Sequence, residues 1–120
     1  VLTEFSLVPL IVGDADPQQV SRVVDALQAD DTLIVVSSDL SHYEDYATNK
    51  THHQRTTLAI EALQSDRIGP HDACGAFPLN GLLTVARQKG WQVETLDLRN
   101  SGDTGGDRSR VVGYGAYVLH

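Results

Sequence analysis

The chain has 120 residues, 41% of them hydrophobic, and a formal charge of −7 from 9 basic and 16 acidic residues. This length suits a single domain over residues 1–120 with a modest core. The scattered basic residues argue against a nucleic-acid surface, and no apolar run approaches the roughly 18 residues that span a bilayer. A single cysteine, Cys74, excludes a disulfide within the chain and fits a reducing compartment, so we predict a cytoplasmic location.

The first third of the chain predicts a β-α-β unit. Residues 5–13 and 32–36 have the apolar composition of strands, and 32–36 is apolar enough to be buried on both faces of a sheet. Between them, Asp16 and Pro17 form a typical helix start, with an N-cap acceptor before a first-turn proline. The helix carries an apolar stripe that should lie on the sheet: Val20, Val23, Val24 and Leu27. We therefore expect a right-handed crossover between two parallel strands.

The rest of the chain predicts two more helices and two more strands. One helix should span about residues 49–64, and another should begin near Pro78 and end at Gly90. Residues 91–98 and 111–119 have strand patterns, and the turn-rich segment between them has no helical period, so these strands should be antiparallel. The expected fold class is α/β, with a mixed, mainly parallel sheet of about four strands and with three helices.

A polar septet follows the second predicted strand: Ser37, Ser38, Asp39, Leu40, Ser41, His42 and Tyr43. In open α/β sheets, ligands and catalytic groups collect just beyond the carboxyl ends of strands. His42 could act there as an acid, a base or a metal ligand, because imidazole changes its protonation near neutral pH. The alternative is a structural role, in which His42 hydrogen-bonds within the loop while Asp39 or Ser41 caps a turn.

Cys74 lies just before the predicted start of the third helix. Free N–H groups and the helix dipole favour a thiolate there, which could bind a metal or act as a nucleophile. His71 could be its partner, although one cysteine and one histidine fall short of the usual four ligands of a zinc site. The alternative is an inert cysteine in an apolar setting. The adjacent His52 and His53 are expected on a solvated face of their helix.

Four motifs, weak singly, are more specific as an ordered set: residues 37–43; Ala73-Cys74-Gly75 with Phe77-Pro78-Leu79 and Leu82-Leu83; Asn100-Ser101-Gly102-Asp103; and Val112-Gly113-Tyr114 with Ala116. Together they resemble the carboxyl-terminal half of the Memo family, also called AmmeMemoRadiSam system protein B. That family is similar to the class III extradiol ring-cleaving dioxygenases. The chain also begins almost inside its first predicted strand, so we expect it to be the carboxyl-terminal half of a larger Memo-like protein.

The resemblance implies a site like that of the dioxygenases, where two histidines and a carboxylate hold a non-haem iron and another histidine is the acid and base. His42 matches the acid/base histidine, and Cys74 stands at the family's cysteine, in place of the carboxylate ligand. The two metal-binding histidines belong to the amino-terminal half. We therefore expect part of an oxidoreductase-type site for iron or copper that binds no metal tightly by itself, with the missing half or another chain as partner.

Other functions stay open. The chain could be a non-enzymatic module that holds a small molecule or peptide in the vestigial cleft, since members of the family have been linked to phosphopeptide recognition. Its acidic balance and lack of an arginine cluster argue against general phosphate binding. It could also be a structural α/β domain or form a homo-oligomer. A thiolate in place of a carboxylate changes ligand softness, which puts ring-cleavage chemistry in doubt.

Overall fold

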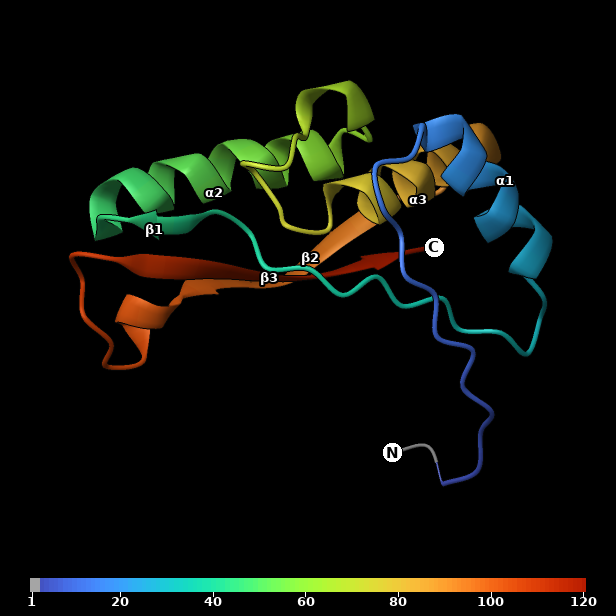
Figure 1. Cartoon of the computed structure of the whole chain (residues 1–120), viewed down its shortest axis with the longest axis horizontal. Helices are drawn as coiled ribbons and strands as arrows, with labels where there is room; N and C mark the ends of the chain where they lie inside the picture. Colours follow the sequence, from blue (N-terminus) through green and yellow to red (C-terminus); the bar gives the residue numbers. More distant parts are fainter. Residues whose placement is uncertain (1–2) are drawn as a thin grey trace.

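The computed structural model describes residues 3–120 and, within them, has three α-helices on one side of a small antiparallel sheet (Figure 1). The helices are α1 (Pro17–Leu27), α2 (Tyr46–Glu61) and α3 (Ala76–Lys89), and the strands are β1 (His42–Glu44), β2 (Val93–Asn100) and β3 (Val111–Leu119). Two 3-10 turns complete the elements, η1 (Ser65–Arg67) and η2 (Ser101–Asp103). In this described part of the chain, no helix has the length and apolar character to cross a bilayer.

β3 is the central strand of the sheet, whose order is β1-β3-β2. It pairs antiparallel with β2 along both strands, from Val93 opposite Leu119 to Asn100 opposite Gly113. It meets β1 only near its own start, where His42 lies opposite Val112. The prediction that the last two strands are antiparallel is confirmed, because no crossover element joins them.

The prediction of a mainly parallel, four-stranded sheet is wrong. Residues 5–13 and 32–36 join no strand ladder among the described residues, and the sheet has three antiparallel strands. Apolar, β-branched composition favours an extended backbone, but a strand forms only where a neighbour satisfies its N–H and C=O groups. Residues 32–36 are not buried on both faces either, since Leu33 and Val35 are 76% and 75% exposed.

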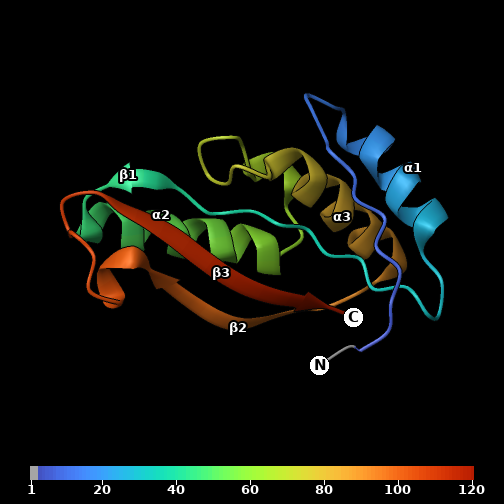
Figure 2. The same ribbon diagram turned by 60° about the horizontal axis from the view of Figure 1, so that its bottom comes forward.

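α1 begins as predicted but packs on a different surface. Asp16 caps it by accepting the N–H of Gln18 at 2.7 Å. The helix lies beside α3 instead of on the sheet, as Figure 2 shows, and of its predicted apolar stripe Val20 is buried while Val23 and Leu27 are exposed. Val20 is buried against Gly81 of α3, so closely that a Cβ at Gly81 would overlap the valine side chain. The glycine therefore sets how near the two helices approach.

α2 and α3 cover the sheet and enclose the core. α2 begins at Tyr46 instead of near Asn49, because the Asp45 carboxylate accepts backbone N–H groups of its first turn. α3 has Pro78 in its first turn and ends at Gly90, as predicted. The core comprises Leu40, Ala59, Ile60, Ile68, Ala73, Ala76, Leu79 and Leu83.

Candidate metal-binding site

The loop that contains Asp39 and His42 is held against the start of β3. The Leu40 side chain is buried, and its N–H donates to the carbonyl of Gly113 at 2.9 Å. The N–H of Gly113 donates back to the carbonyl of Ser41 at 3.1 Å. A buried anchor and two backbone hydrogen bonds thus fix the backbone between Asp39 and His42.

The loop before α3 joins this first loop through four hydrogen bonds, one of them between the Ser38 hydroxyl and the Cys74 sulfur at 3.7 Å. The N–H of Cys74 donates to the carbonyl of Asp39 at 3.1 Å, and the N–H of Asp39 donates to the Cys74 sulfur at 3.2 Å. The N–H of Gly75 donates to the Ser38 hydroxyl at 2.8 Å. These bonds fix the position of the Cys74 sulfur beside the backbone of Asp39.

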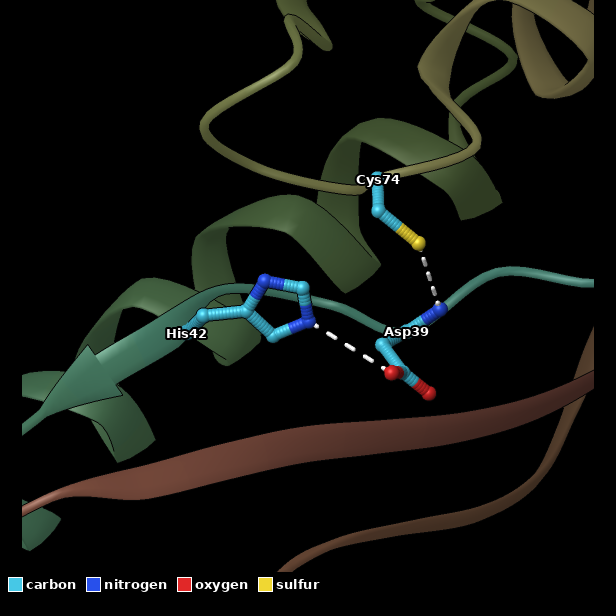
Figure 3. A group of neighbouring side chains, drawn as sticks. All are labelled: Asp39, His42 and Cys74. Atoms are coloured by element: carbon cyan, nitrogen blue, oxygen red, sulfur yellow. Dashed lines mark hydrogen bonds and ion pairs between the residues drawn. The ribbon is translucent and has the colours of Figure 1, made fainter.

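Asp39, His42 and Cys74 come together where the two loops meet (Figure 3). One carboxylate oxygen, one imidazole nitrogen and the Cys74 sulfur all lie within 4.8 Å of one another. Bonds from a metal to such ligands are about 2.0–2.3 Å long, so atoms that share one ion lie within roughly 5 Å of each other. The structure therefore places His42 and Cys74, the two site residues selected from the sequence, at the spacing that one ion requires.

Asp39, which was predicted from the sequence only to cap a turn, is the third member of this group. Its Oδ2 lies 3.5 Å from Nε2 of His42, and the two side chains are 50% and 35% exposed. The signal in the sequence is the Asp-x-x-His spacing, because a turn brings residues three apart to the same side. The group is open to solvent, and the roles of His42 in catalysis and of Cys74 in metal binding stay predictions.

A second polar cluster surrounds His52 on α2. Its Nδ1 lies 2.8 Å from Glu44 Oε1, and its Nε2 lies 2.7 Å from Asp72 Oδ1. Arg55 donates to the same Asp72 oxygen at 3.2 Å, and the N–H of Gly69 donates to the other at 2.8 Å. A ring with a carboxylate at each nitrogen donates two hydrogen bonds, which only the protonated imidazole can do.

The charges in this cluster stabilise one another. Burial alone would lower the pKa of His52, but its hydrogen bonds to Asp72 and Glu44 outweigh burial and raise that pKa. Burial would raise the pKa of Glu44, but hydrogen bonds from His52 and Ser41 lower it. The pKa of Asp72 is lowered against the effect of burial by the Gly69 N–H and by His52. These shifts favour the charged forms, an imidazolium between two carboxylates.

The expectation that His52 and His53 lie on a solvated helix face is wrong. His53 is only 2% exposed, and its ring lies over Gly113, where a side chain would overlap it. Hydrophobic periodicity does not predict the burial of His53, because the buried face of α2 is mostly polar. That face comprises Asn49, His53, Thr56, Thr57, Ala59 and Ile60. Ser41 satisfies two of these polar groups, through Asn49 and His53. His71, the other candidate partner of Cys74, is exposed and is not part of the Asp39 group.

The chain matches the family model described as Memo-like protein over residues 1–118. It is 30% identical to MEMO1 family protein Ta0237 of Thermoplasma acidophilum over 95% of this chain and 46% of that protein. It is 31% identical to a MEMO1 family protein of Sulfolobus acidocaldarius, over 92% of this chain and 43% of the relative. It is 29% identical to a MEMO1 family protein of Thermotoga maritima, over 99% of this chain and 46% of that protein. The chain thus spans about half the length of these curated relatives. On the family match and these identities, it belongs to the Memo-like protein family.

Proposed function

We propose that this chain supplies part of an oxidoreductase-type metal site, in which Cys74 and Asp39 bind iron or copper and His42 transfers protons. The convergence of the three groups within 4.8 Å is the observation that supports the proposal. The donor set fits both metals, because thiolates bind Cu(I) and iron, while imidazole and carboxylate also bind iron. A bound redox metal would supply dioxygen chemistry like that of the ring-cleaving dioxygenases.

His42 and Asp39 are placed for the proton-handling part of this function. The Asp39 carboxylate lies beside His42 Nε2 and can orient the ring and the proton that this nitrogen carries. Cys74 contributes a sulfur that already accepts an N–H from the neighbouring loop. A reducing compartment such as the cytoplasm, which we propose as the location, would keep this sulfur free for a metal.

We propose that the remaining ligands come from polypeptide that corresponds to the part of the relatives outside the match. Large apolar side chains, all more than half exposed, support such a partner: Phe5, Leu7, Val8, Leu10, Ile11, Leu33 and Val35. Surfaces this apolar usually mark a binding site for another polypeptide. The partner segment would cover these side chains by packing against residues 5–13 and 32–36.

The same apolar surface favours a second function, a non-enzymatic module that binds a peptide. A groove of about 580 Å³ runs between residues 32–36 and the end of β3, with Leu79, Leu82 and Trp91 among its lining residues. Beyond Gly113, the β3 edge facing this groove has no strand partner in the described part of the chain. An extended peptide could add to such an edge through main-chain hydrogen bonds. In this function, binding would not depend on a metal.

Cys74→Ser should weaken the binding of Fe(II) and Cu(I) to this chain by at least about tenfold, because the serine oxygen is a poor replacement for a thiolate. Asp39→Asn should also weaken Fe(II) binding, since it removes the anionic oxygen. Anaerobic calorimetric titration measures both affinities. The unmodified chain and both variants should bind the metals more weakly than the unmodified chain mixed with the remaining polypeptide of a relative. That polypeptide would complete the ligand set.

The matched control for this experiment is His71→Ala, which removes an exposed histidine near Cys74 that lies outside the group of three. Its metal affinities should equal those of the unmodified chain. Unchanged affinity in Cys74→Ser would contradict the metal-site proposal, and so would an equal loss in His71→Ala. Peptide binding that is unaffected by chelators and by Cys74→Ser would then favour the non-enzymatic module.

A further inference from the structure

The imidazole of His52 joins two segments that each lead to one of the candidate site loops. Its Nδ1 lies 2.8 Å from Glu44 Oε1, and its Nε2 lies 2.7 Å from Asp72 Oδ1. Glu44 is two residues after His42, and Asp72 is two residues before Cys74. One ring on α2 therefore contacts both the strand that carries His42 and the loop that carries Cys74.

Both carboxylates are also held at their second oxygen. Glu44 Oε2 accepts the Ser41 hydroxyl at 2.9 Å, and Asp72 Oδ2 accepts the N–H of Gly69 at 2.8 Å. The His52 side chain is 13% exposed, and the two carboxylate side chains are 28% and 17% exposed, so water screens these contacts only in part. Each carboxylate thus links the ring to the backbone of its own segment, and the position of the ring constrains both segments.

The bridge made by His52 differs in strength from the direct bonds between the two loops. Those bonds join neutral groups, such as the N–H of Cys74 and the carbonyl of Asp39, which are 3.1 Å apart. A protonated imidazole between two carboxylates makes charge-assisted hydrogen bonds, which are roughly twice as strong as neutral ones. The bridge therefore adds a stronger tie between the segments than a single bond of the neutral kind.

We infer that His52 is a positioning residue of the proposed metal site, because its two ring nitrogens set how far the His42 loop lies from the Cys74 loop. The inference rests on the proposed function, since this separation matters for chemistry only if the two loops share an ion. His52 is not one of the three candidate ligands and acts through its two carboxylate partners. Losing either contact of the ring should let the loops separate.

Two variants, His52→Gln and His52→Asn, test the bridge because each keeps a different half of it. The glutamine amide nitrogen takes a place close to that of Nε2 and the asparagine nitrogen a place close to that of Nδ1, so each variant retains one donor. The measurement is hydrogen–deuterium exchange of the Cys74 amide, which donates to the Asp39 carbonyl, followed by NMR in the metal-free chain. It is made at about pH 6, where histidine is mostly protonated.

Both variants should speed exchange of the Cys74 amide by about tenfold relative to the amide of Leu83, because a charge-assisted bond is lost at one end of the bridge. Leu83 is a fully buried core residue of α3, so its amide reports on global unfolding. If His52 only stabilises the fold as a whole, the two amides will speed up together. That result, or an unchanged Cys74 rate in either variant, would overturn the inference.

The matched control is Arg55→Gln. Arg55 contacts Asp72 at 3.2 Å and, among the described residues, forms no ion pair with Glu44, so it reaches one segment only. Its side chain is 73% exposed, and the variant should leave the Cys74 amide exchanging as in the unmodified chain. An increase equal to that of the His52 variants would contradict a role that depends on bridging.

Metal affinity connects the bridge to the proposed function. Both His52 variants should bind Fe(II) about tenfold more weakly than the unmodified chain, which is the lower end of the usual loss when a residue that orients ligands is replaced. Undiminished Fe(II) binding in Cys74→Ser would overturn the metal site and with it the role of His52 there. Weakened binding in Cys74→Ser, together with an unchanged Cys74 exchange rate in the His52 variants, would overturn the bridge alone.

Discussion

Gly113→Ala should lower the free energy of unfolding by about 3 kcal/mol, the upper end of the cost of overpacking a core. A Cβ at this position would overlap the imidazole of His53, which is 2% exposed and cannot move into solvent without breaking its hydrogen bond to Ser41. The N–H and C=O of residue 113 also hold the loop that carries Asp39 and His42. Chemical denaturation measures the loss, and metal affinity should fall along with stability.

Gly13→Ala is the matched control for this substitution. No atom lies within 4 Å of the position that its Cβ would occupy, so stability should change by less than about 0.5 kcal/mol. The double variant Gly113→Ala/His53→Ala should lose less stability than the sum of its two single variants, because it removes the ring that the new methyl group meets. Strictly additive losses would contradict the overlap as the cause.

His52→Leu should destabilise the protein by about 2–3 kcal/mol near pH 6. The leucine fills similar space but leaves two largely buried carboxylates, Glu44 and Asp72, without the imidazolium between them. Thermal or urea unfolding of both proteins gives the difference. His71→Leu, at an exposed histidine, should leave stability close to that of the unmodified chain.

The loss of stability caused by His52→Leu should depend on pH in a defined direction. The folded pKa of His52 is raised above 6.5, so its contribution is fully present below that value and is lost as the pH rises through the raised pKa. Glu44 and Asp72 have pKa values lowered from 4.5 and 3.8, so their contribution is lost as the pH falls through the lowered values. Arg55 also faces the cluster, through its contact with Asp72. The destabilisation by His52→Leu should therefore be largest between about pH 4.5 and about pH 6.5, and a constant value up to about pH 9 would contradict this account.

Local signals predicted the elements that depend on local interactions. The Asp16 cap, the Gly90 helix end and the antiparallel pairing of the last two strands follow from side-chain caps, backbone conformation and a short connection. The prediction that residues 5–13 and 32–36 form a parallel strand pair was wrong for the opposite reason. A parallel strand depends on hydrogen-bond partners distant in sequence, and composition does not show whether such partners are present.

The candidate site was predicted as two converging loops, and the structure brings His42 and Cys74 together. Asp39 was underestimated because a carboxylate in a turn is usually a cap. His53 was misplaced because hydrophobic periodicity treats every histidine in a polar run as solvated. Its burial depends on the space left by Gly113, some sixty positions along the chain, which no pattern local to His53 reveals.

The contacts between the two loops that carry the candidate ligands all come from this chain. Because the bonds of Ser38 to Gly75 and of Asp39 to Cys74 hold the geometry in advance, little order has to be created when a further polypeptide arrives. Under the proposed metal function, assembly with a partner polypeptide would resemble the docking of two rigid bodies more than folding upon binding. The loops would then be shaped to take up an ion before that partner closes over them.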